Sequence, residues 1–200
     1  MVRAEQVQVR RREKMKPYLR VAAAIPLLLM AASPFLPMWF FQLNAPFLGQ
    51  RWMEVHVHPL SGVGGEVENV NVINHYVGLG MIGNEHIPEI AYIPYVYTAM
   101  IFVTAVFTYS LVTGRRRAAF VSLLVAIAIF VSILGYMYNW LYNYTHTILP
   151  GAPMKIEPFD PPFLGEYRIA NFVVRSFMGP SLILQLAAVA IGFVLMRKVR

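Results

Sequence analysis

The sequence predicts an all-α integral membrane protein with four transmembrane helices and a small extracytoplasmic cap of mixed β and loop structure. Three observations lead to this prediction: 58% of the 200 residues are hydrophobic, only 14% are charged, and four long windows contain no charged residue. Soluble domains are about 45–50% apolar and about 25% charged, so the composition excludes an ordinary soluble domain. It also excludes a disordered chain, which combines low hydrophobicity with high charge.

Each charge-free window is long enough for one span, because a helix that crosses the ~30 Å hydrocarbon core needs about 20 mostly apolar residues. The windows are Val21–Gln50, Ile90–Gly114, Ala118–Met154 and Ser176–Met196. Within them we predict spans at 21–41, 92–112, 118–141 and 176–196. The third window could hold two spans by length, but its tail, Tyr142–Met154, is polar and contains Pro150 and Pro153. One span is therefore expected there.

The distribution of Lys and Arg predicts the orientation of the spans. Segments 1–20, 113–117 and 197–200 together carry 13 basic residues and two acids, whereas segments 42–91 and 142–175 carry four basic residues and eight acids. Both termini are therefore expected in the cytoplasm, and the two long connections on the extracytoplasmic face of the cytoplasmic membrane. The net charge of +7 is then explained by topology and by contact with anionic lipid, so no nucleic-acid partner is expected.

The first span is expected to remain as an uncleaved helix. The alternative is a signal peptide cleaved after the small residues Ala31–Ser33. Uncleaved insertion is favoured because Pro34 follows this site and the apolar run continues to Phe41.

The outer segments have two kinds of pattern. In segment 42–91, Trp52–Pro59 alternates between polar and apolar residues, which predicts a strand with Glu54, His56 and His58 on one face. Glycines 62, 64 and 65 are expected to form a turn, and Glu66–Val72 alternates again, which predicts a second strand. Segment 142–175 has five prolines between Pro150 and Pro162, so extended backbone along the membrane surface is expected there.

The five histidines suggest a metal site, since all of them lie in the outer segments. His56 and His58 could chelate one metal ion, with His75, His86 and Met81 completing the site. His146 could join it if the segments meet. Imidazole and thioether suit copper, and imidazole also suits nickel and zinc. The alternative, favoured by spacing alone, is that these histidines bond to nearby glutamates or face water.

Several other sites are excluded by residue type. No histidine lies within a span, so in-span haem ligands are lacking, and the absence of cysteine excludes Cys-ligated centres. No charged residue lies in the middle of a span, which argues against a pump or transporter. We find neither a phosphate-binding glycine loop nor the spacing of a hydrolytic triad, so no catalytic residue is assigned and a non-enzymatic role is expected.

Two stretches of the outer segments resemble a known family. Gly65–Leu79 reads GEVENVNVINHYVGL and is similar to the signature GDxxEINxLNHYIGM. The sequence APMKIEPFDPPFLG, followed by IANF, covers much of 152–172 and is similar to APxKxxPFxPPLxG…IANF. These signatures belong to small four-span membrane proteins encoded beside nitrous oxide reductase in clade II nos gene clusters, the NosB-like proteins. Val77 and Leu79 depart from the pattern, and Met81 could supply the thioether that Leu79 lacks.

The resemblance implies an accessory role in copper-dependent respiration: metal delivery, assembly or docking of a redox partner, with copper as the expected metal and a respiratory membrane or extracytoplasmic protein as partner. The residues it singles out, in addition to His75, are Asn74, Tyr76, Gly78, Pro161, Pro162 and Asn171. Two alternatives stay open. One is a metal-free structural anchor of a larger respiratory complex, and the other is a quinone-reactive subunit that uses His75, Tyr76 and Glu89.

Overall fold

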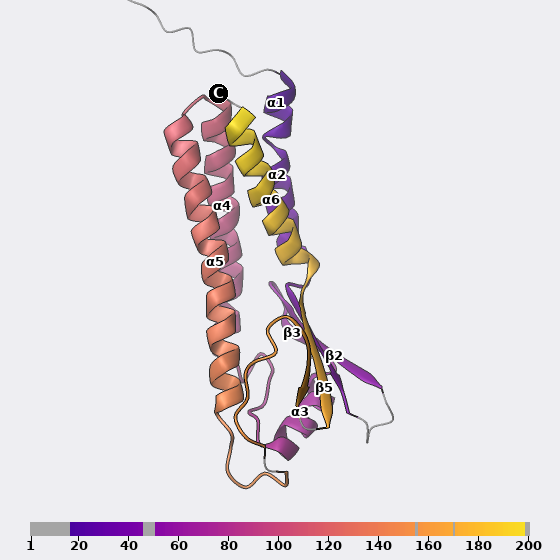
Figure 1. The fold of residues 1–200 in the computed structure, drawn as a ribbon. Helices are drawn as coiled ribbons and strands as arrows, with labels where there is room; N and C mark the ends of the chain where they lie inside the picture. Colours follow the sequence, from indigo (N-terminus) through magenta and orange to yellow (C-terminus); the bar gives the residue numbers. More distant parts are fainter. Residues whose placement is uncertain (1–16, 46–50, 155, 170, 199–200) are drawn as a thin grey trace, which may run out of the picture.

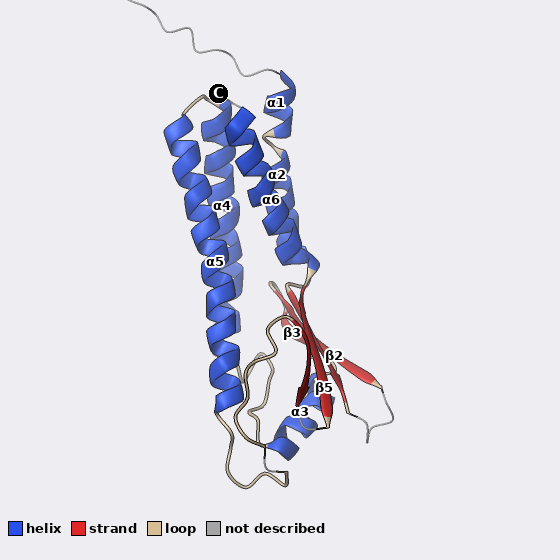
Figure 2. Ribbon diagram, in the orientation of Figure 1, coloured by secondary structure: helices blue, strands red, loops and turns tan. Residues whose placement is uncertain are grey.

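The computed structural model describes residues 17–45, 51–154, 156–169 and 171–198. Most of the basic N-terminal segment, together with Lys155, Ala170 and Arg200, lies outside the described residues. The long helices stand beside one another at one end of the molecule, and a twisted sheet with a short helix lies at the other end (Figures 1 and 2). We call this second part the cap. It comprises residues 39–87 and 147–178, as far as they are described.

Four helical segments are long and apolar enough, by length and composition, to cross a membrane: Pro17–Phe35, Pro88–Val112, Arg116–His146 and Pro180–Lys198. The first consists of α1 (Pro17–Ala22), α2 (Ile25–Ala32) and the 3-10 turn η1 (Ser33–Phe35). The second consists of η3 (Pro88–Tyr92) and α4 (Ile93–Val112), and the remaining two are α5 (Arg116–His146) and α6 (Pro180–Lys198). The prediction is confirmed in its coarser form: four helices are long and apolar enough to span a membrane, and a small antiparallel sheet accompanies them.

The first span is broken between α1 and α2. Pro26 lies in the first turn of α2, where its missing N–H is tolerated, but it cannot continue a helix that arrives from α1. Thr108 of α4 donates a hydrogen bond of 3.1 Å to the carbonyl of Ala23 beside the break. Such a side-chain donor satisfies a carbonyl group at the break between two helices in an apolar surrounding.

The first helix ends earlier than predicted, so the expected span 21–41 is wrong at its C-terminal end. The helical segment stops at Phe35, and Leu36 is extended with φ −127° and ψ 150°. Pro37 explains this, because the residue before a proline is pushed out of the helical region. Trp39–Asn44 then forms strand β1. The fourth span is displaced in the same way, since Ser176–Met178 belongs to a strand and α6 begins at Pro180.

The cap contains a five-stranded antiparallel sheet in the order β3-β2-β1-β5-β4. The other strands are β2 (Trp52–His58), β3 (Gly62–Gly65), β4 (Gly165–Ile169) and β5 (Phe172–Met178). The strand predicted at Trp52–Pro59 is confirmed by β2, whereas the glycines expected as a turn form β3. Strand β1 pairs with β5, Trp39 opposite Met178 and Asn44 opposite Val173, so both outer segments contribute to one sheet.

The second predicted strand, Glu66–Val72, is wrong because these residues begin helix α3 (Val67–Val77). The alternating pattern concealed a helical one: Val70, Ile73 and Val77 recur at spacings of three and four residues. Ile73 and Val77 are buried with Ala45, Met53 and Phe172, and Val70 packs against this cluster. The segment is therefore helical, because a helix places Val70, Ile73 and Val77 on one side, where they pack against this buried cluster.

Helix α5 is much longer than a bilayer requires. Its 31 residues extend about 46 Å at 1.5 Å per residue, compared with a hydrocarbon core of ~30 Å. The predicted span 118–141 therefore covers only part of the helix, which continues to His146. In Figure 1 the C-terminal part of α5 runs beside the cap, so this helix belongs to both parts of the molecule.

Replacing Gly135 with alanine is expected to stabilise the protein by about 0.5–1 kcal/mol, because glycine in a helix interior is entropically costly. Gly135 lies inside α5, and nothing lies within 4 Å of the position its Cβ would take. Unfolding of the two proteins in the same mild detergent, followed by circular dichroism, measures the difference. A loss of stability would mean that another surface packs against this position.

Candidate functional site

The two faces of the sheet differ in chemistry, because successive side chains of a strand point to opposite faces. The face toward α3 and α5 is apolar and includes Phe41, Leu43, Val55, Val57, Phe172 and Val174. The other face carries Gln42, Glu54, His56, His58, Glu166 and Arg175. On it, Gln42 donates to Glu54 at 2.9 Å and Arg175 donates to Glu166 at 2.8 Å. The polar face is thus built from both outer segments.

The two stretches that carry the family resemblance meet at the end of α3. The N–H of Leu149 donates to the carbonyl of Gly78 at 2.7 Å, and the N–H of Met154 donates to the carbonyl of Tyr76 at 3.0 Å. Gly78 ends α3 with φ +81°, a left-handed conformation that glycine adopts without a steric penalty. A Cβ at this position would lie 3.0 Å from the Leu149 carbonyl oxygen and from Ala152. The glycine therefore permits both the turn and the close approach.

Asn74, on the buried side of α3, belongs to a polar cluster with α5 and the following loop. The Tyr144 hydroxyl of α5 donates to the carbonyl of Gly80 at 2.7 Å and also interacts with Asn74. Asn71 donates to the carbonyl of Ile82 and accepts from its N–H, both at 2.8 Å. The site prediction for Asn74 thus corresponds to a buried position that ties α3 to the long helix.

The predicted chelating pair lies on the polar face of the sheet. The His56 ring lies 6.0 Å from the Phe40 ring and covers Gly64 on the neighbouring strand. His58, at the end of β2, accepts a hydrogen bond from the N–H of Leu60 at 3.2 Å through Nδ1. Both rings are half-buried, and each has a local partner within the cap.

The remaining predicted metal ligands are spread over three elements. His75 and Tyr76 are exposed on α3, and Met81 is exposed in the loop that follows α3. His146, at the end of α5, is stacked on Tyr142 at 3.9 Å, and its Nδ1 lies 2.8 Å from the Tyr142 carbonyl. The segments that hold His75 and His146 meet, but the two side chains have different surroundings.

Among residues 17–45, 51–154, 156–169 and 171–198, no three His, Cys, Asp or Glu side chains gather closely enough to hold a metal ion. The donors of the predicted copper site are therefore not assembled within this part of the chain. A copper ion held here would need ligands of other types or from a second protein, and the copper assignment stays a prediction.

The other residues singled out by the resemblance fall into a buried and an exposed group. Pro161 and Pro162 are buried in the segment before β4, where two rings without N–H groups suit a segment outside the sheet ladder. Asn171 is exposed at the turn between β4 and β5. Tyr76 has 46% of its surface exposed and is the largest of these side chains on the outside of the cap.

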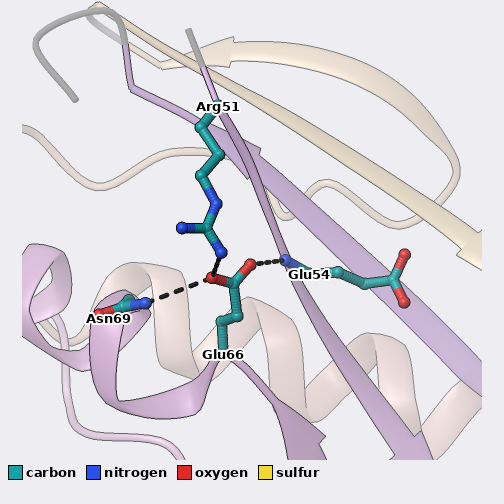
Figure 3. A network of polar contacts seen from close by, with 4 residues as sticks. All are labelled: Arg51, Glu54, Glu66 and Asn69. Atoms are coloured by element: carbon teal, nitrogen blue, oxygen red, sulfur yellow. Dashed lines mark hydrogen bonds and ion pairs between the residues drawn. The ribbon is translucent and has the colours of Figure 1, made fainter. Parts of the chain in front are cut away.

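A polar network that the sequence patterns did not indicate connects α3 to β2 (Figure 3). The Glu66 carboxylate, at the start of α3, pairs with Arg51 and accepts hydrogen bonds from the Glu54 N–H at 3.4 Å and from Asn69 at 3.3 Å. The spacing of Glu66 and Asn69 by three residues, typical of the first turn of a helix, is the signal that could have indicated it. A partly exposed ion pair contributes less than about 1 kcal/mol, so the network orients α3 more than it stabilises it.

Along this network runs a groove lined by Arg51, Met53, Glu66, Asn69, Val72, Ile73 and Tyr76. Val72 has 71% of its surface exposed and lies one helical turn before Tyr76. The outer side of α3 therefore presents Val72, His75 and Tyr76 together beside a charged pair.

Comparison with protein-family models, curated proteins and solved structures found no match to this chain.

Proposed function

We propose that this protein is a membrane accessory protein of copper-dependent respiration, of the nitrous oxide reductase type, and that its cap docks a respiratory partner at the extracytoplasmic face. One observation carries the proposal: the two stretches that resemble the NosB-like signatures lie far apart in the sequence but meet at Tyr76 and Gly78. Two segments that only linked the spans would not be expected to form backbone hydrogen bonds with each other.

The outer side of α3 supports docking over metal delivery. Interfaces are enriched in aromatic side chains and depleted of charge at their centre, and Tyr76 and Val72 are exposed there beside His75. Delivery would require that the protein hold copper by itself, whereas three clustered His, Cys, Asp or Glu donors are lacking in the described parts of the chain. An imidazole at His75 could still donate a hydrogen bond or complete a site whose other ligands belong to the partner.

Replacing Tyr76 with alanine in the native host is expected to lower nitrous oxide consumption at least tenfold while the membrane content of the protein stays unchanged. Truncating a buried aromatic anchor of an interface commonly costs 2 kcal/mol or more, or about 30-fold in affinity. Tyr76 is half-exposed here, so its loss should not unfold the cap. Leu60→Ala is the matched control, because Leu60 is an exposed apolar residue in the turn between β2 and β3, outside both family signatures. Unchanged consumption in the Tyr76 variant would contradict the docking role.

Copper titration of the purified protein separates docking from delivery. We expect the wild type and His75→Ala to bind copper equally and weakly. A tight stoichiometric site that His75→Ala abolishes would favour delivery. The metal-free anchor is the alternative, and it predicts that a partner stays bound during purification in the presence of a chelator whether His75 is present or not.

Labelling from outside the cell tests the orientation on which the proposal depends. Because the chain has no cysteine, single cysteines can be introduced at His75 and Arg116, which are both exposed. An impermeant maleimide is expected to label His75→Cys on intact cells and Arg116→Cys only after the membrane is permeabilised. The reverse pattern would place the cap in the cytoplasm and remove the proposal.

A further inference from the structure

A cavity of about 720 Å³ lies between α4, α5 and the cap. Its α5 wall is a single stripe in which the lining residues recur at every third or fourth position from Val125 to Leu141, as one face of a helix requires. These positions span about 24 Å along the helix. The α4 wall includes Ile93, Val96 and Tyr97, Phe41 belongs to the cap, and Met38 lies directly before the cap.

The cavity begins among residues that lie within the membrane spans and ends beyond them. Tyr97 is hydrogen-bonded to Ser181 in the first turn of α6, with 2.8 Å between the hydroxyl oxygens, so this level lies near the end of the shorter spans. Val125 and Ala128 belong to the part of α5 that overlaps these spans, and both are exposed. The cavity therefore connects the hydrocarbon layer with the underside of the sheet.

A second cavity of about 170 Å³ lies inside the cap, between the apolar face of the sheet, α3 and the end of α5. Six residues line both cavities: Phe41, Val57, Val63, Ile87, Trp140 and Leu141. The two spaces thus share one wall of apolar side chains. They are therefore adjacent, and together they offer an apolar lining that extends from the level of the spans into the cap.

The size of the cavities and the charge of the residues that line them limit which kind of molecule can bind there. A helix with side chains is about 10–12 Å wide and does not fit in a volume of about 170 Å³, whereas a hydrocarbon chain fits and would enter from the lipid. Glu89 is the one charged residue among those lining the two cavities, and it lies close enough to the Tyr136 hydroxyl to interact with it. A negatively charged head group would face this carboxylate, and no basic residue is among the described residues that line the two cavities, so a head without negative charge is favoured.

We propose that the cap binds the hydrocarbon chain of a membrane amphiphile whose head carries no negative charge. The chain passes along the α5 stripe and ends in the inner cavity, beneath Val55 and beside Ile73. The polar head stays near Glu89 and Tyr136. This site lies on the buried side of α3, whereas Val72, His75 and Tyr76 are exposed on its outer side, so it does not depend on the docking role proposed above.

The test uses a long-chain alcohol with a photoreactive diazirine at the end of its chain, added to the purified protein in vesicles of neutral phospholipid. Illumination and peptide mapping are expected to locate cross-links in the inner cavity, on α3 or the apolar face of the sheet. The matched sulfate ester of the same alcohol, at equal membrane content, is expected to label these peptides at least fivefold less. Wild-type protein without cap cross-links would overturn the site, and equal labelling by the two probes would overturn the assignment of the head.

Two variants of α5 provide a matched pair. Ala128→Trp places a large ring in the cavity, and Val131→Trp places the same ring on an exposed position of the helix that does not line it. Cap labelling is expected to fall at least fivefold in the first variant and to stay within twofold of the wild type in the second. Equal labelling of the two variants would overturn the path along α5. If Ala128→Trp does not fold, the cross-links mapped on the wild-type protein still test whether the site exists.

Discussion

Replacing Trp39 with alanine is expected to destabilise the protein by about 3–5 kcal/mol, the range for removing a buried aromatic side chain. Trp39 is the first residue of β1 and has 0% of its surface exposed. Its ring lies 5.0 Å from that of Phe163 and packs in a core with Met30 and Leu182 from two of the spanning helices. The sheet and the helices therefore share this side chain, and its loss should weaken the attachment of the cap.

Denaturant unfolding in mild detergent, followed by circular dichroism, measures this effect. Trp39→Phe is the matched control, because it keeps a buried aromatic ring while it removes part of the indole and its 2.8 Å hydrogen bond to Ser176. Its expected cost is about 1–2 kcal/mol, since Ser176 keeps its bond to the Phe163 carbonyl at 3.0 Å. Equal, small costs for the two variants would show that the ring does not join the cap to the helices.

Replacing Gly179 with alanine is expected to cost about 3 kcal/mol, at the upper end of the usual range for overpacking. Gly179 connects β5 to α6, and its N–H donates to the carbonyl of Met38 at 2.8 Å. A Cβ at this position would lie 2.3 Å from the carbonyl oxygen of Pro37. Both neighbours are backbone, so the contact can be relieved only if the first and last spans move apart where they enter the sheet.

The same unfolding measurement applies, with Gly135→Ala as the control, because that substitution adds the same methyl group in open space. The two variants should change stability in opposite directions. If Gly179→Ala leaves stability unchanged, the close approach of the two chain segments is absent in the folded protein. Retained helix content with a protease-sensitive cap would localise the damage to the junction.

Part of the site could be read from local sequence. The strand that carries His56 and His58 follows from alternation, and the loop rich in proline follows from the rigidity of that residue. The outer side of α3 could not be read in this way, because Val70 and Val72 fit the strand period whereas Val67 and Val70 fit the helix period. Burial of Ile73 and Val77 against Phe172, nearly a hundred residues away, decided between them.

The sequence by itself determined that four segments can span a membrane, because the bilayer imposes a minimum apolar length on each helix separately. It also determined the predicted orientation, which depends only on where Lys and Arg lie. The tertiary structure alone decided that Trp39–Asn44 pairs with Phe172–Met178, and that the two outer segments form one sheet with an apolar interior. Strand pairing and face burial depend on partners that are distant in the chain, so no local pattern contains them.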